Sequence, residues 1–339
     1  MKMNKIVKWI EKKDKNRDKK RRTLYSRLLV ACFLFSLVPT LIISILYYNA
    51  SSKYLNEVAT ELGVSMINQT SSELETFFSS VTRIGDIAAD NQRIQETLRV
   101  DFEGDIGKQY SADLQNDAEL YFARYLQPDI LGLVVLGDNG GEYKSHDRTF
   151  KNQIHKEQRW YKEIQSSQKY TWFPPHVGQF ANVHVGEKVI TCGKPIVDKA
   201  TGEINGIVML DIKESAVRDI ISTRLGKTGY MIILDENNHI ILSPDGYQVS
   251  ENNLSALINS QSEKYGANTD LQILADNNFI ATYKEMPSTG WKLMGIIPME
   301  ELSKGNQILS VLMVISLIVT GVLALLAAYS LSRNVVKPF

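Results

Sequence analysis

The sequence predicts an α+β protein: a long N-terminal helix, two tandem antiparallel-sheet modules, and a transmembrane helix on either side of them. Three observations support this prediction. Two uncharged apolar stretches, residues 28–48 and 308–331, lie near opposite ends of the 339-residue chain. A segment of helical periodicity follows the first stretch. Two runs of strand-like sequence with the same internal order come after that segment.

Each apolar stretch is long enough to cross a bilayer, because a helix of about 20 residues spans about 30 Å of hydrocarbon. The first stretch exceeds the apolar core of a secretory signal, and no A-x-A-like cleavage site follows it. We therefore expect transmembrane helices at residues 28–48 and 307–331. The first should be an uncleaved anchor.

Basic residues predict the orientation. Residues 1–27 hold twelve Lys and Arg against three Asp and Glu, whereas the segment between the spans holds 24 against 35. Because Lys and Arg near a span stay in the cytoplasm, we expect both termini inside, residues 49–306 outside, and a two-span protein of the cell membrane. The basic tail, residues 1–27, is expected to contact the lipid bilayer and no nucleic acid, since an anchor directly follows it.

The outer region begins with a helix. Apolar residues recur at spacings of three and four from Leu55 to Ala88, and no proline occurs between residues 50 and 90. This pattern predicts one continuous helix. Its apolar face either packs only on its own domain or also forms the seam of the homodimer that we expect. A second helical stretch is expected at residues 112–125.

Two modules of strands follow. In the first, about residues 90–212, we expect strands at 130–136 and 142–145, a helix near 160–164, an aromatic-rich loop, and strands at 188–197 and 204–212. In the second, about residues 213–300, a helix at 214–225 precedes strands within 230–243, at 278–285 and at 290–298. The repeated order of strand, acidic turn and strand predicts tandem sheet modules.

Several motifs occur in a characteristic order: RWYKEI at 159–164, YTWFPP at 170–175, GIVMLDI at 206–212 and GYMIILDENNH at 229–239. Together with the long helix, they resemble the double Cache sensor region of bacterial receptors, built from two PAS-like modules, over about residues 49–306. They are most similar to two-component sensor histidine kinases that work with AraC-family regulators. Residues 332–339 are similar to the start of a HAMP linker, with Pro338 at its proline position.

The resemblance implies a receptor that senses an extracellular small molecule and signals to a cytoplasmic histidine kinase, whose partner is a cognate response regulator. Two alternatives remain. A methyl-accepting chemoreceptor shares the outer fold and the HAMP-like start, and a membrane-anchored binding protein without signalling would need no such exit. The chain stops within the HAMP-like element, so it looks like the input part of a longer receptor.

Catalytic and metal-binding patterns are missing from the sequence. The histidines show no H-x-x-x-H or H-E-x-x-H spacing, and no G-x-S-x-G nucleophile elbow occurs. We therefore expect no enzyme, no cofactor and no metal in residues 1–339. A kinase core, if the full protein has one, would lie in a further segment.

The resemblance also implies a ligand site in the first module. In amino-acid-binding members of the family, a Trp-Tyr pair and a strand aspartate contact the ligand, and Trp160, Tyr161 and Asp211 match them. The arginine that holds the ligand carboxylate is replaced by Gln158, with Arg159 one position away. Because a bidentate guanidinium is hard to replace, we expect a sugar, a small amine or a peptide more than a free amino acid.

Two further family positions, a Tyr and an Asp, hold His176 and Gly178 here. The expected pocket residues are aromatic and polar: Trp160, Tyr161, Trp172, His176, Thr191 and Asp211. Aromatic faces beside a few hydrogen-bonding groups suit such ligands. As alternatives, Trp160 and Trp172 would be core packing of the sheet, and Asp211 would cap the helix that begins near Glu214.

Overall fold

The computed structural model describes residues 3–335 except 103, 146–154, 179–186, 224, 226–227, 247–270 and 276–278. The chain divides into two compact units. Met1–Thr60 and Glu300–Phe339 form one unit, and Glu61–Met299 form the other. Pro338, at the proline position of the HAMP-like stretch, lies outside the described residues.

The first unit contains the apolar parts of two helices, α1 (Met3–Ala89) and α7 (Met299–Val335). Phe33–Ala89 and Ser310–Ala327 each include a window long and apolar enough to cross a membrane. Pro39 lies inside α1 without ending it. A Cβ added at Gly321 would lie 3.8 Å from the Phe33 ring, so the two helices pack closely at this level.

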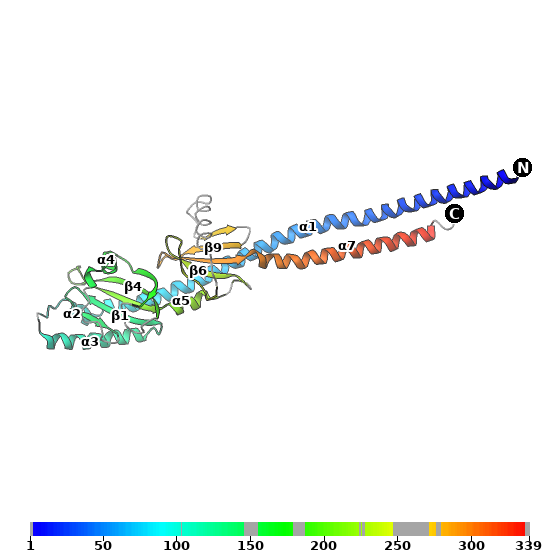
Figure 1. Cartoon of the computed structure of the whole chain (residues 1–339). Coiled ribbons are helices and arrows are strands. Elements are labelled where there is room, and N and C mark those ends of the chain that lie inside the picture. Colours follow the sequence, from blue (N-terminus) through cyan, green and yellow to red (C-terminus); the bar gives the residue numbers. More distant parts are fainter. Residues whose placement is uncertain are drawn as a thin grey trace. The chain divides into compact units, whose positions relative to one another are not determined.

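The second unit contains two five-stranded antiparallel sheets (Figure 1). The first sheet has the order β2-β1-β5-β4-β3, with the bounds β1 Ile130–Gly137, β2 Glu142–Lys144, β3 Thr171–Val177, β4 Lys188–Val197 and β5 Ile204–Lys213. The second has the order β7-β6-β10-β9-β8, with the bounds β6 Tyr230–Leu234, β7 Ile240–Leu242, β8 Leu271–Ala275, β9 Phe279–Glu285 and β10 Lys292–Pro298. The two sheets therefore have equivalent strand orders.

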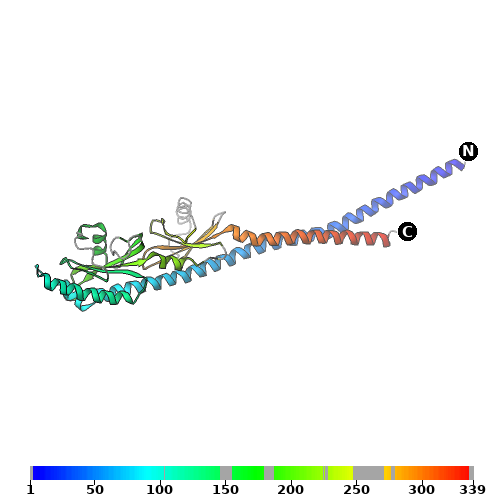
Figure 2. The same ribbon diagram turned by 60° about the horizontal axis from the view of Figure 1, so that its bottom comes forward.

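Helices cover both faces of the first sheet. The C-terminal part of α1 and the helix α3 (Ile106–Tyr125) lie on one side of it (Figure 2). The short helix α4 (Arg159–Ser166) lies on the other side, after the 3-10 turn η1 (His155–Glu157). Alternation along the strands supports both layers: Leu133, Val135 and Leu210 pack toward α1, whereas Val134 and Met209 pack toward α4.

Side-chain caps fix the helices that join α1 to the first sheet. Asn91 accepts hydrogen bonds from the backbone N–H groups of Arg93 and Ile94 at the start of α2 (Gln92–Leu98). Asp105 accepts one from Lys108 N at the start of α3. At the other end of the sheet, α5 (Glu214–Ile221) directly follows β5 and leads to the second sheet.

The predicted α+β fold class, with its long N-terminal helix and antiparallel sheets, is confirmed. The aromatic-rich loop predicted between the helix and the strand at 188–197 is wrong, because residues 171–177 form β3. The two prolines of this segment argued against a strand. They are tolerated because β3 is an edge strand, and because Pro174 and Pro175 lie between Phe173 and His176, where its pairing with β4 is interrupted.

Candidate functional site

Four cross-strand neighbours form a row across the first sheet. Gly132 of β1 pairs with Asp211 of β5, Asp211 pairs with Thr191 of β4, and Thr191 pairs with Phe173 of β3. Residues two apart on a strand share a face, so Asp211 lies on the same face as Met209. That face, called the α4 face below, is covered by α4.

A hydrogen-bonded chain of side chains occupies the centre of this row. The Thr191 hydroxyl donates to Asp211 Oδ1 at 2.5 Å, and His176 Nε2 lies 3.3 Å from the same hydroxyl oxygen. His176 Nδ1 lies 2.9 Å from the carbonyl oxygen of Pro174. Thr191 and Asp211 are buried, with 0% and 3% of their surface exposed. Burying a carboxylate is costly unless it has partners, and Thr191 supplies one of them and fixes the orientation of the group.

Asp211 does not cap the following helix. The N-cap residue of α5 is Lys213, whose side chain makes no cap hydrogen bond. The Asp211 carboxylate instead faces Thr191 across the sheet. The alternative interpretation of Asp211 as a capping residue therefore does not apply.

Apolar side chains surround the polar chain on the α4 face. Trp160 and Phe173 are partly buried against a cluster of buried residues, namely Val134, Leu136, Tyr161, Ile164, Ile207 and Met209. The close approach of α4 requires a glycine on β4, because a Cβ at Gly193 would come within 2.8 Å of Ile164 Cδ1. This face of the sheet therefore carries both a buried carboxylate and partly buried aromatic rings.

Tyr161 lies on this face but is bound to the turn that follows β1. Its hydroxyl donates to Asp138 Oδ1 at 3.0 Å, and Gln165 Nε2 lies 3.4 Å from Asp138 Oδ2. Burial, together with the nearby Asp138 carboxylate, raises the pKa of Tyr161 above its ordinary value. Tyr161 thus contributes its ring to the wall of the site and anchors α4.

Trp172 lies on the opposite face of the first sheet. Its ring centroid is 4.7 Å from that of Phe78 on α1 and 6.2 Å from that of Trp291, next to β10. Because successive strand residues point to opposite faces, Trp172 and Phe173 cannot both face α4. Trp172 belongs to the core and is not part of the proposed site. Phe173, which the sequence analysis did not select, takes its place.

The structure also places the other residues at or next to the family's ligand-binding positions, namely Gln158, Arg159 and Gly178. Gln158 is the N-cap residue of α4 and makes no side-chain cap hydrogen bond, and Arg159 is the exposed first residue of that helix. Gly178 directly follows β3. Within the ranges that the structure describes, no group of three or more His, Cys, Asp or Glu side chains could hold a metal ion.

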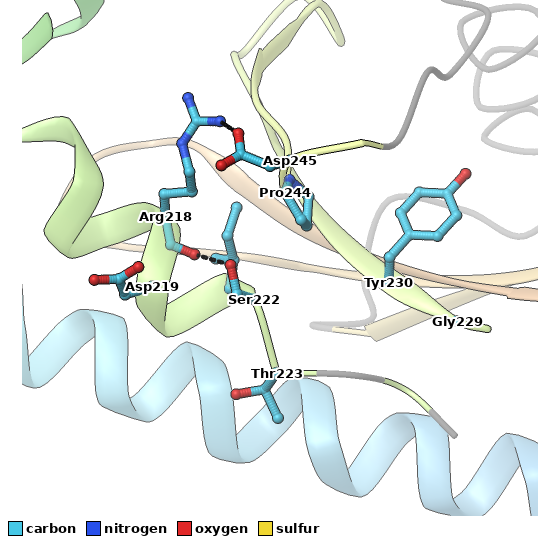
Figure 3. A pocket seen from close by; sticks show the side chains of 9 residues that line it. Arg218, Asp219, Ser222, Thr223, Gly229, Tyr230, Pro244 and Asp245 are labelled. Carbon is cyan, nitrogen blue, oxygen red and sulfur yellow. Dashed lines mark hydrogen bonds and ion pairs between the residues drawn. The ribbon is translucent and has the colours of Figure 1, made fainter. Parts of the chain in front are cut away.

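A cavity of about 220 Å³ lies beside the second sheet (Figure 3). Its lining includes Arg218, Asp219, Tyr230 and Asp245, and it shares no residue with the α4 face. The Arg218 guanidinium is already engaged by Asp245 and by the buried Glu214. We favour the α4 face as the functional site, because it combines a buried carboxylate with aromatic rings, whereas the charge of Arg218 is balanced within the chain.

Sequence comparison gives a family and a curated relative. The profile described as a Cache domain matches residues 48–305, which confirms the predicted double Cache region. A probable methyl-accepting chemotaxis protein of Bacillus thuringiensis subsp. konkukian is 24% identical over 336 residues. The alignment covers 94% of this chain and 46% of that protein. The chain thus spans about half the length of this relative.

Several solved structures are similar to this chain. The ligand-binding domain of a Campylobacter jejuni chemoreceptor, in complex with L-valine, is 15% identical with a TM-score of 0.52, covering 74% of this chain and 97% of that one. The corresponding domain of a Pseudomonas fluorescens chemoreceptor, in complex with L-isoleucine, is 14% identical with a TM-score of 0.48, covering 74% and 97%. A Pseudomonas aeruginosa amino-acid chemoreceptor domain, in complex with GABA, is 14% identical with a TM-score of 0.48, covering 73% of this chain and 100% of that one.

These structures correct one expectation. The preference for a sugar, small amine or peptide over a free amino acid is wrong, because the Campylobacter jejuni chemoreceptor domain that shares this fold was solved with L-valine and with 4-methylisoleucine. The preference rested mainly on the missing arginine at Gln158. A ligand carboxylate can also be held by backbone N–H groups, so one missing guanidinium does not exclude this ligand class.

Proposed function

We propose, from the premise that this chain belongs to the Cache domain family, that it is the input region of a membrane receptor whose ligand binds on the α4 face of the first sheet. A Cache domain is a sensor domain and is not catalytic. With the two apolar helices, the family indicates a membrane protein. We further propose that both termini lie in the cytoplasm and that residues 49–306 lie outside, as the basic tail predicts.

The observation that carries the proposed site is the buried Asp211 carboxylate with its fixed partner Thr191. A buried anion favours a ligand with a cationic nitrogen, and charge-assisted hydrogen bonds are about twice as strong as neutral ones. Trp160 and Phe173 lie on the same face, where aromatic rings accept an apolar side chain or a cation. A free amino acid or a related amine meets both requirements.

The proposed output is that of a methyl-accepting chemoreceptor. In support, the similarity to the probable chemotaxis protein of Bacillus thuringiensis covers 94% of this chain and so extends beyond the Cache domain. A sensor histidine kinase is the second candidate, favoured by the order of the motifs at 159–164, 170–175 and 206–212. Residues 332–339, with their HAMP-like sequence, suit either output.

A ligand screen tests the ligand class. The full chain, in detergent or in a lipid disc, is mixed with free amino acids, amines, neutral sugars and carboxylates without an amine, and its thermal unfolding is followed. We expect only compounds with a cationic nitrogen to raise the unfolding temperature. Stabilisation by neutral sugars or amine-free carboxylates alone would refute the proposed ligand class.

A second experiment distinguishes the chemoreceptor from the histidine kinase and uses a receptor that includes an output segment after residue 339. A chemoreceptor gains or loses methyl groups on glutamate side chains when its ligand is added. A histidine kinase instead incorporates labelled phosphate from ATP on a histidine. Detection of the phosphohistidine would contradict the chemoreceptor proposal and support the second candidate.

A further inference from the structure

Strand β3 contacts both the proposed site and the core behind the sheet. On the α4 face it contributes Phe173, which packs on the α4 cluster, and His176, which approaches Thr191. On the other face it contributes Trp172, which packs on Phe78 of α1. Adjacent residues of one strand therefore contact the ligand face and α1.

The same strand is one of the two edge strands of the first sheet, the other being the short strand β2. It lies at the sheet edge and pairs with β4 alone, whereas β1, β5 and β4 each have two neighbours. Its pairing is interrupted between Phe173 and His176, where Pro174 and Pro175 supply no backbone N–H group. A strand held on one side, through an interrupted ladder, moves at a lower energy cost than a central strand.

The segment at the start of β3 is bound to α1. The Tyr170 hydroxyl lies 2.8 Å from the carbonyl oxygen of Thr82 and 3.0 Å from Asp86 Oδ1. Lys194 of β4 binds the same Asp86 oxygen at 2.5 Å and lies 5.3 Å from the centroid of the Tyr170 ring. Any displacement at this end of β3 therefore acts directly on α1.

Trp172 also connects the first sheet to the second. Its ring centroid lies 6.2 Å from that of Trp291, and both rings contact Phe78. Trp291 directly precedes β10, and β10 continues at Met299 into α7. Three residues before Trp291, Ser288 N lies 3.3 Å from Glu75 Oε1 of α1. The three rings thus join α1 to one residue from each sheet module.

We propose that β3 is the element that transmits occupancy of the α4 face, and that Trp172 is its coupling residue. A ligand that contacts Phe173 and His176 shifts β3, and Trp172 carries the shift to α1 through Phe78 and to the second sheet through Trp291. A ligand can do this only if it binds the two arrangements with different affinities. Densely packed interiors transmit such shifts well.

The test follows the four tryptophans of the full chain by fluorine NMR after incorporation of fluorotryptophan. Phe173→Leu alters the α4 face of β3 and is expected to shift the resonance of Trp291, in the other module. In a Trp172→Leu background, adding Phe173→Leu is expected to leave the Trp291 resonance where it lies in the Trp172→Leu single variant. Trp172→Phe replaces Trp172→Leu if the latter variant does not fold.

A matched control alters the same face on another strand. Val134→Ala removes an apolar side chain of the α4 cluster from β1, which has a neighbour on each side. This variant is expected to leave the Trp291 resonance in place. The proposal is overturned if Phe173→Leu does not shift Trp291, if the shift persists without Trp172, or if Val134→Ala shifts Trp291 equally. The inference rests on the proposed sensing site, but its test needs no ligand, so failure here is distinct from failure of the ligand screen.

Discussion

Thr191 donates its hydroxyl hydrogen bond to Asp211 across two neighbouring strands of the first sheet, with 2.5 Å between the two oxygens. Both side chains are buried. This pair places an oriented carboxylate on the α4 face, the face that also carries the rings of Trp160 and Phe173. The proposed recognition of a cationic nitrogen depends on this geometry.

Replacing Thr191 by valine is expected to weaken both folding and ligand binding. Valine keeps the shape but removes the donor, and a buried polar group that loses its partner costs about 1–3 kcal/mol. Thr191→Ser keeps the hydroxyl and is expected to retain ligand affinity with a smaller loss of stability. Denaturant unfolding and calorimetric titration measure the two effects. Equal ligand affinities for the two variants would contradict the assigned role of the hydroxyl.

Substitutions of Trp172 and Trp160 are expected to differ in their effects on stability and on ligand affinity. Trp172 is buried against Phe78, so Trp172→Ala should lower the free energy of unfolding by about 3–5 kcal/mol. Trp160 is only partly buried, so Trp160→Ala should cost about 1 kcal/mol and mainly reduce ligand affinity. Urea unfolding of both variants, with calorimetry on Trp160→Ala, tests this contrast. Unchanged affinity in a folded Trp160→Ala protein would remove Trp160 from the site.

The sequence could predict most of the helices and strands, but not which face of the sheet each side chain points to. Apolar runs bounded by turn residues predicted β1, β4 and β5, and the family motif pointed to Trp160 and Asp211, which lie on the α4 face. The aromatic-rich segment was expected to be a loop, but residues 171–177 form β3, whose two prolines lie where its pairing with β4 is interrupted. Once residues 171–177 are known to form a strand, alternation alone assigns Trp172 to the core and Phe173 to the α4 face.

The cross-strand pairing could not be read from the sequence. Thr191 and Asp211 are twenty residues apart in the chain, and only the register of β4 with β5 makes them neighbours. Register depends on the packing of whole strands against α1 and α4. The contact between Trp172 and Trp291 likewise depends on how the two sheets pack around Phe78.

Acid is expected to weaken a contact between α2 and the β4–β5 turn. Hydrogen bonds from the Arg99 guanidinium and from Ala200 N lower the pKa of Asp198 from 3.8 to about 2. Because the pKa is lower in the folded state, the contact stabilises the protein above about pH 4. That stabilisation is lost as the pH falls toward 2.

Urea midpoints measured between neutral and acidic pH check this expectation. Asp198→Asn should be less stable than the wild type at neutral pH and should lose less of its stability in acid. Asp129→Asn is the control, because the Asp129 carboxylate is 3.8 Å from Lys213 at a more exposed position. A parallel pH dependence for wild type and Asp198→Asn would contradict the role given to Asp198.

Membrane orientation is expected to follow the basic tail. Cys192 is buried, and burial raises the pKa of its thiol, so it should resist labelling. In a Cys32→Ser background, a cysteine at the exposed position Lys108 should react with a membrane-impermeant maleimide in intact cells. A cysteine at Lys5 should react only after the membrane is opened. Labelling of Lys5→Cys in intact cells would contradict the proposed orientation.

The most direct test of the sensing site compares the wild-type chain with Asp211→Asn in the presence of one stabilising amino acid or amine. Binding at about 100 times the dissociation constant adds about 2.7 kcal/mol to the wild-type stability. Loss of a charge-assisted hydrogen bond of about 1.5–3 kcal/mol should weaken binding by about tenfold to a hundredfold in the variant. Asp219→Asn, on the exposed side of α5, is the matched control and should bind as the wild type does. Calorimetric titration of a folded Asp211→Asn protein is predicted to show this loss of affinity, and an affinity equal to that of the wild type would contradict the proposed site.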